Sequence, residues 1–246
     1  MKNVTKRIFA AVLTLTVVAA CVVTTSPQAT AKKRERSDIT IGIDPGHQSR
    51  GNFGTEPMGP GSSVKKTKVA GGTHGTTSGV PEYKLTLAVG KYLKKELKAR
   101  GYKVVMTRSR NDVDISNKER AEKLNKKCNI AIRLHADGAA PSAKGATALY
   151  PSLENPFLSR SVCKKSKKLS QVLLDSYCRG TSLKKRGLSA RDDLTGTNWS
   201  KIPVTLIEMG FMTNESDDTY MAKAKNRKKM AKALADGLDA YYGFSK

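Results

Sequence analysis

The chain from residue 39 reads Ile39-Thr40-Ile41-Gly42-Ile43-Asp44-Pro45-Gly46-His47. Its first five residues are β-branched or small and run into Asp-Pro-Gly, so they predict a short buried strand that ends in a loop. Similar apolar runs follow at residues 103–107, 128–135, 145–150 and 202–209. Helical spacing separates or follows them over residues 85–97, 116–126, 159–178 and 217–242. This alternation predicts one α/β domain with a twisted, mostly parallel sheet covered by helices on both faces.

Residues 48–81 interrupt the pattern. They are rich in Gly, Pro, Ser and Thr and lack periodic apolar residues, which predicts a long loop. Because the loop directly follows a strand, it starts at the sheet edge where α/β proteins assemble their sites. His74 lies inside it among glycines, either as an exposed loop residue or as a substrate or oxyanion contact when the loop closes.

The N-terminus has the pattern of a secretory signal peptide. Three basic residues precede an uncharged stretch over residues 8–23, and the small residues Ala29-Thr30-Ala31 follow, which predicts cleavage after Ala31. The stretch falls short of the ~20 residues that a transmembrane anchor needs. Val18-Ala19-Ala20-Cys21 also resembles a lipoprotein box, so a chain lipidated at Cys21 is the alternative. Either way we expect an exported protein, secreted or in the cell wall.

Behind the signal peptide (1–31) we expect a basic linker (32–37) and a single catalytic domain (38–246). The 246 residues carry 45 Lys and Arg against 21 Asp and Glu, a net charge of +24 that becomes +21 after cleavage. Such a charge attracts polyanions. Outside the cytoplasm these are anionic wall polymers such as teichoic acids, so we expect no nucleic-acid partner, and we expect a monomer. Three cysteines remain, and we expect free thiols: Cys128, Cys163 and Cys178.

Two of the three histidines, His47 and His135, follow or end predicted strands. Catalytic zinc typically has three protein ligands and one water, and imidazole is a common ligand. Glu82, where the long loop ends and a helix begins, is placed to be the third. The alternative is structural: hydrogen-bonded histidines, and an acid favoured in a first helical turn by the helix dipole.

Glu208 ends an apolar strand, where an acid destabilises the fold unless it is paired, bound to a metal or functional. Near a zinc-bound water it could act as general base. The alternative is an ion pair with an arginine such as Arg120 or Arg191.

Together these segments resemble the zinc-dependent N-acetylmuramoyl-L-alanine amidases. The motifs that carry the resemblance are, in order, Asp44-Pro45-Gly46-His47, Glu82, Arg133-Leu134-His135-Ala136-Asp137 and Glu208-Met209-Gly210-Phe211-Met212-Thr213-Asn214. The resemblance implies a six-stranded, mainly parallel sheet. It also implies one zinc ion per chain, bound by His47, Glu82 and His135, with Glu208 as the catalytic carboxylate.

The activity implied is cleavage of the amide bond between N-acetylmuramic acid and L-alanine in peptidoglycan. Many members have Ser and Asn where this chain has Arg133 and Asp137, which leaves a substrate contact by Asp137 open. Two other functions stay open at this point. One is a zinc carboxypeptidase that cuts within the stem peptide, and the other is a non-catalytic protein that binds the wall or nucleic acid through its charge.

Overall fold

The computed structural model describes residues 34–245. The predicted signal peptide, its cleavage point at Ala31 and the alternative lipidation site at Cys21 lie outside these residues. Among the residues described, no helix is both long and apolar enough to cross a membrane.

A six-stranded sheet with the order β4-β1-β5-β8-β6-β7 forms the centre of the domain. Its strands are β1 (Thr40–Pro45), β4 (Lys103–Met106), β5 (Ile130–Asp137), β6 (Ala146–Tyr150), β7 (Lys185–Ala190) and β8 (Val204–Phe211). All neighbours pair in parallel except β6 and β8. The predicted mostly parallel, six-stranded α/β fold is therefore confirmed. The sequence did not predict β7, whose residues are all exposed or half-buried.

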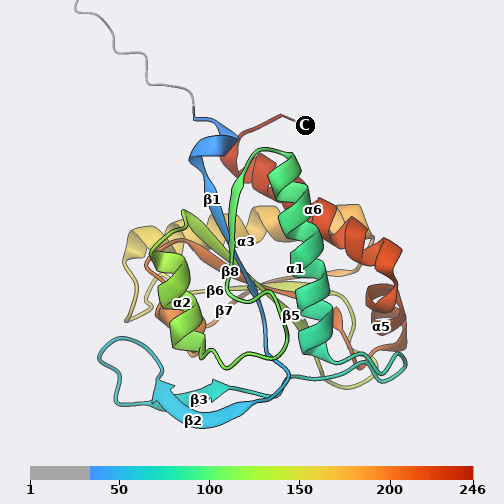
Figure 1. Ribbon diagram of the computed structural model, residues 1–246, viewed down its shortest axis with the longest axis horizontal. Helices are drawn as coiled ribbons and strands as arrows, with labels where there is room; N and C mark the ends of the chain where they lie inside the picture. The colour runs from blue at the N-terminus through green and yellow to red at the C-terminus, as the bar shows by residue number, and fades with distance from the viewer. Residues whose placement is uncertain (1–33, 246) are drawn as a thin grey trace, which may run out of the picture. The chain divides into compact units, whose positions relative to one another are not determined.

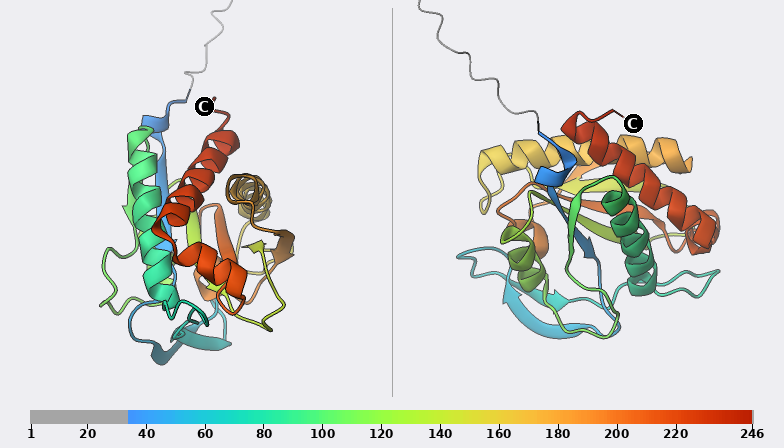
Figure 2. Two further views of the ribbon diagram at one scale, coloured as in Figure 1. Left: turned by 90° about the vertical axis from the view of Figure 1, so that its right-hand side faces the viewer. Right: turned by 45° about the horizontal axis from the view of Figure 1, so that its top comes forward.

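Helices cover both faces of the sheet, as predicted. Four of them lie on one face: α1 (Glu82–Ala99), α3 (Arg160–Thr181), α5 (Glu215–Ala222) and α6 (Ala224–Tyr242). On this face α6 lies between α1 and α3 (Figure 2). The other face carries α2 (Asn117–Asn125) and the short α4 (Thr195–Asn198). Side chains alternate along a strand, so Ile41 and Ile43 face the larger core while Gly42 faces Leu124 of α2.

The predicted loop over residues 48–81 contains an antiparallel hairpin, β2 (Asn52–Pro57) and β3 (Lys65–Val69), so the prediction of a loop over the whole stretch was wrong. The hairpin lies beyond the carboxyl end of β1 (Figure 1). The indole of Trp199 donates to the Pro57 carbonyl at 2.9 Å, and the Asn117 amide donates to the Lys68 carbonyl at 2.8 Å. Most hairpin residues are partly or fully exposed, which explains the absence of an apolar period.

The first and last described segments meet at the amino end of β1, on the side of the domain opposite the hairpin (Figure 1). Arg36, in the short helix η1 (Arg36–Asp38), donates to Asp239 at 2.8 Å and to the Ser245 carbonyl at 2.8 Å. The end of the predicted linker is therefore packed against the domain.

The structure agrees with the predicted helix ends and with the predicted free thiols. Ser116 and Glu119 form the predicted capping box of α2, and Gly101, which follows α1, has a φ of 93° that favours glycine. The three cysteines of the described region are free.

Candidate metal centre

The sheet brings the predicted site residues together at one edge. β1, β5 and β8 are adjacent and parallel, so their carboxyl ends meet. Pro45 pairs in register with Leu134, which places His47 beside His135. Because His135 pairs in register with Glu208, this acid is on the neighbouring strand at the same level.

Glu82 lies between the two histidines. Its Oε2 is 3.2 Å from His47 Nε2, and its Oε1 is 3.1 Å from His135 Nδ1. The imidazole rings stand edge to face with their centroids 4.9 Å apart. Three donor atoms, one from each residue, lie within 4.8 Å of one another. Such a cluster of two imidazoles and one carboxylate is a donor set that suits zinc.

The Nε2 atoms of the two histidines are suited to bind a cation. His47 Nδ1 lies 2.8 Å from the Ala70 carbonyl. When Nδ1 donates its proton there, Nε2 of a neutral ring presents a lone pair to the Glu82 carboxylate, and two acceptors in contact need a proton or a cation between them. His135 Nε2 is buried and has no hydrogen-bond partner. The residues present therefore fit a metal ion.

Charge interactions within the cluster are strong. Burial opposes ionisation of Glu82, but hydrogen bonds from His135 and His47 hold its pKa well below the usual range. For His47, burial is outweighed by the Glu82 carboxylate, which raises the pKa of the imidazole. For His135, burial dominates and lowers the pKa. An ionised Glu82 is thus available as an anionic ligand.

The loop between β3 and α1 lines one side of the cluster with residues 70–73. The Thr73 amide donates to Glu82 Oε2 at 3.0 Å. Gly72 has a φ of 81°, and a Cβ there would lie 2.9 Å from His47 Cγ, so only glycine fits. The loop is anchored by Asp218, whose carboxylate accepts from the amides of Thr77 and Ser78 at 2.9 and 2.7 Å.

The cluster lies in an open cleft of about 660 Å³. Asp137, Glu208 and Thr213 also line it. Thr213 belongs to the motif that follows Glu208, but its position in the cleft was not anticipated. His74 does not line the cleft; it is exposed and forms an isolated bridge with Pro81. The cleft therefore contains five of the six predicted site residues.

Glu208 forms no ion pair within 4.0 Å in residues 34–245, so the alternative of a partner arginine was wrong. Arg120 pairs with Asp44 and Arg191 with Asp193. The Oε2 atom of Glu208 is buried without a hydrogen-bond partner. Burial, followed by the negative charges of Glu82 and Asp137, raises its pKa well above the usual value. A carboxyl group of this kind is suited to exchange a proton.

A buried charge network lies beneath the centre. Asp44 is 1% exposed. Its two carboxylate oxygens accept from Arg120 at 3.0 Å and from Arg133 at 2.9 Å, and Thr107 donates at 2.6 Å. Burial favours the neutral acid, but the two guanidinium groups hold the pKa of Asp44 well below its usual range. Arg133 also packs against Gly196, where a Cβ would lie 2.2 Å from the guanidinium.

We expect Asp44→Asn to destabilise the domain by about 3–5 kcal/mol at neutral pH, because two buried guanidinium groups lose their counter-charge. A carboxyl group whose pKa is lower in the folded than in the unfolded protein stabilises the fold at pH values above its unfolded pKa. This stabilisation is lost as the pH falls toward the folded pKa. The wild-type advantage should therefore shrink by about 1.4 kcal/mol per pH unit below about pH 4. Urea unfolding of both proteins at several pH values measures this. An advantage independent of pH would contradict the assignment.

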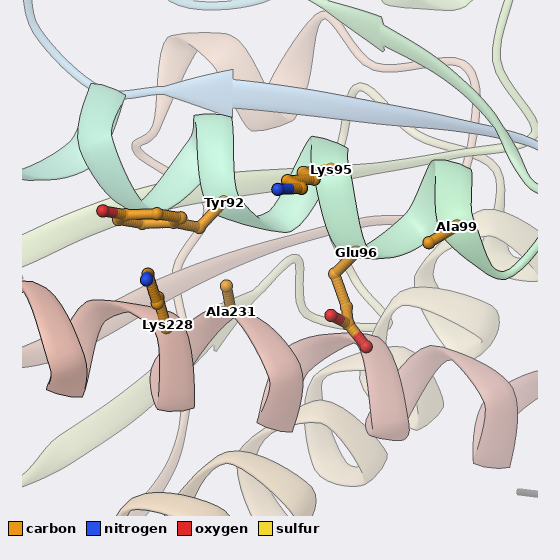
Figure 3. Close-up of a pocket in the computed structure, with 6 residues that line it drawn as sticks. All are labelled: Tyr92, Lys95, Glu96, Ala99, Lys228 and Ala231. Carbon is orange, nitrogen blue, oxygen red and sulfur yellow. The ribbon is translucent and has the colours of Figure 1, made fainter.

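A second groove, of about 260 Å³, lies between the adjacent helices α1 and α6 (Figure 3). Its lining residues are Tyr92, Lys95, Glu96, Ala99, Lys228 and Ala231. The Lys228 ammonium lies 5.8 Å from the centre of the Tyr92 ring. The groove contains no histidine and a single carboxylate, so it lacks the donors found in the first cleft.

The sequence is similar to known proteins. The family profile described as N-acetylmuramoyl-L-alanine amidase matches residues 41–240. The N-acetylmuramoyl-L-alanine amidase Rv3717 of Mycobacterium tuberculosis is 30% identical over 221 residues, which cover 87% of this chain and 90% of that protein.

The fold is also similar to those of solved amidase structures. The N-acetylmuramyl-L-alanine amidase Ami1 of Mycobacterium smegmatis has a TM-score of 0.77 at 27% identity, covering 85% of this chain and 99% of that one. The apo form of Ami1 from Mycobacterium abscessus has a TM-score of 0.74 at 26% identity, with coverages of 82% and 98%.

Proposed function

This chain belongs to the N-acetylmuramoyl-L-alanine amidase family of hydrolases, and we propose that it is a zinc enzyme that cleaves the amide bond between N-acetylmuramic acid and L-alanine in peptidoglycan. The observation that carries the proposal is the cluster of His47, Glu82 and His135 in an open cleft. On the strand beside His135, Glu208 has no ion pair in the described chain.

In this proposal His47, Glu82 and His135 hold one zinc ion per chain. A zinc ion bound there supplies a Lewis acid for the amide carbonyl and lowers the pKa of its water to about 7. Glu208 takes the proton of the attacking water and returns it to the leaving amide nitrogen. Asp137 and Thr213 line the same cleft, and we propose that Asp137 contacts the substrate.

The test is a digest of purified peptidoglycan, with the chemical ends of the products identified by mass spectrometry and the metal content of the protein measured. We expect new N-terminal L-alanine and about one zinc per chain. New ends inside the stem peptide would indicate a carboxypeptidase instead. Absence of both cleavage and zinc would leave only a binding function. Glu208→Gln protein, prepared in parallel, controls for contaminating hydrolases.

We also propose that the protein is exported, with cleavage after Ala31. This proposal rests on the sequence pattern of residues 1–31. Sequencing the N-terminus of the exported protein tests it: the expected first residue is Lys32, whereas a lipidated Cys21 would show that the protein is a lipoprotein.

We propose that anionic wall polymers are a further partner. The support is the basic surface of the adjacent helices α3 and α6, whose exposed lysines are Lys164, Lys165, Lys167 and Lys168 on α3 and Lys225, Lys228, Lys229 and Lys232 on α6. Binding to isolated walls should weaken steeply as salt rises from about 0.1 M to about 1 M, because the screening length falls from about 10 Å to about 3 Å.

The matched variants neutralise part of that surface. Replacing the four α3 lysines by glutamine should reduce wall binding, while replacing four lysines elsewhere should reduce it less: Lys65, Lys66, Lys126 and Lys127. Wall binding that is insensitive to salt would show that the charge does not drive it. Equal losses in the two variants would indicate net charge alone.

A further inference from the structure

Two buried arginines hold three consecutive backbone carbonyls next to the metal centre. Arg120 donates to the carbonyls of Pro45 at 2.8 Å and His47 at 3.0 Å. Arg108 donates to those of Pro45 at 3.0 Å and Gly46 at 2.9 Å. A guanidinium group is planar, and its donors have a fixed spacing. The two side chains therefore constrain the path of the backbone, in addition to supplying positive charge.

This constraint acts on an unusual conformation. His47 has a φ of 57°, in the left-handed region that residues other than glycine rarely adopt. Such a conformation persists only where its surroundings hold it. The carbonyls of Gly46 and His47 belong to the two peptide planes that flank the His47 Cα, and each accepts from an arginine. Fixing both planes fixes φ and ψ of His47, and so the direction of its Cα–Cβ bond, while the contact of Nδ1 with the Ala70 carbonyl orients the ring.

The same backbone confines the second histidine. The Gly46 amide donates to the Leu134 carbonyl at 2.8 Å. A Cβ at Gly46 would lie 2.3 Å from His135 Cε1, so this segment packs directly against the ring. A shift of residues 45–47 would therefore move the His47 imidazole and the backbone against which the His135 ring packs.

Arg108 is difficult to explain as an ordinary ion pair. It is 2% exposed, and no ion pair within 4.0 Å involves it in the described chain. Its partners are neutral: backbone carbonyls, the Asn111 side chain and the Thr86 hydroxyl. Burial, together with the positive charge of Arg120, lowers its pKa to about 10. The Asp44 carboxylate offsets part of this effect but forms no ion pair with Arg108. A buried charge without a direct partner destabilises a fold, so its presence calls for a role in the site.

We propose that Arg108 and Arg120 are positioning residues that hold residues 45–47 so that His47 and His135 face Glu82 and bind the metal. Neither arginine lines the cleft, so both act through the backbone. The inference rests on the proposed function, because it assumes that these histidines bind zinc.

The test uses Arg108→Lys and Arg120→Lys in the otherwise unchanged chain, which keep the charge and remove the planar fork. Zinc affinity is measured by competition with a chromogenic chelator, and ligand geometry by the visible absorption of the Co²⁺-loaded protein. We expect about 10–100-fold weaker zinc binding, the range that follows loss of a residue supporting a metal ligand, and an altered Co²⁺ spectrum.

Arg100→Lys is the matched control. Arg100 bonds Glu96, Asp236 and Asp239 at the other end of α1, so its replacement should lower stability without changing zinc affinity. If an arginine variant fails to fold, the variant Thr86→Val tests the proposal in its place. Its hydroxyl, fully buried, donates to the Gly46 carbonyl at 2.8 Å, and its loss should weaken zinc binding. Thr181→Val, which loses a buried bond to Tyr177 within α3, should not.

The outcomes separate the two proposals. A wild-type protein that binds no zinc would overturn the proposed function, and this inference with it. Wild-type protein that binds zinc, beside folded Arg108→Lys and Arg120→Lys variants with unchanged affinity and Co²⁺ spectrum, would overturn the inference alone. The same holds for Thr86→Val in place of an unfolded variant.

Discussion

Glu208→Gln is expected to lower turnover of peptidoglycan by about 10²–10⁴-fold while the protein keeps its zinc, because glutamine preserves the shape and cannot accept the proton. The zinc should stay because a catalytic centre leaves one position open for water and the cluster of His47, Glu82 and His135 is complete without Glu208. Turnover and metal content are measured on the same preparation.

Asp137→Asn is the comparison variant, since Asp137 lines the same cleft. Its effect should be much smaller. Near-normal turnover of Glu208→Gln with a large loss in Asp137→Asn would transfer the role to Asp137, and loss of zinc from Glu208→Gln would make Glu208 a ligand.

The pH dependence of kcat/KM should report the same carboxyl group. A general base acts in its ionised form, so activity should fall as the pH falls through the pKa of Glu208. Burial raises that pKa, while bound zinc lowers it. We expect the acidic limb to lie above about 4.3, the ordinary value for glutamate, and to be absent from the residual activity of Glu208→Gln.

His47→Ala and His135→Ala should each abolish stoichiometric zinc binding and activity, because a three-ligand site has none to spare. The loss of zinc affinity should exceed the ~10–100-fold typical for a residue that only supports a ligand. Metal analysis after dialysis and chelator competition measure it.

His74→Ala provides the matched control, since His74 is exposed and lies outside the cleft. It should keep one zinc and full turnover. Stoichiometric zinc in His47→Ala would refute the ligand assignment, and loss of activity in His74→Ala with zinc retained would assign the loop histidine to the substrate.

The parts of the fold that the sequence predicted are those with contiguous apolar runs. β1, β5 and β8 are almost fully buried, so their patterns are clear. The candidate site residues at their carboxyl ends lie together because these strands are adjacent and parallel. The hairpin of β2 and β3 was not predicted, because a run such as Lys65-Lys66-Thr67-Lys68-Val69 buries few side chains and has no apolar face.

The supporting structure around the site could not be predicted for a different reason. Asp44, Arg120 and Arg133 come from β1, α2 and β5, and no local pattern records which charges pair across such distances. The same limit applied to Glu208, where Arg120 was a plausible partner in sequence but pairs with Asp44 in the fold. The left-handed backbone of His47 likewise depends on arginines more than 60 positions away.

Both ends of the described chain meet at the amino end of β1, while the cleft opens at the carboxyl ends of the strands (Figure 1). A label, bead or solid support joined to either end therefore attaches on the far side of the domain from the cleft. Immobilised protein should keep its entrance free for a substrate as large and insoluble as a wall fragment. The same geometry allows a purification tag at the C-terminus without obstructing the cleft.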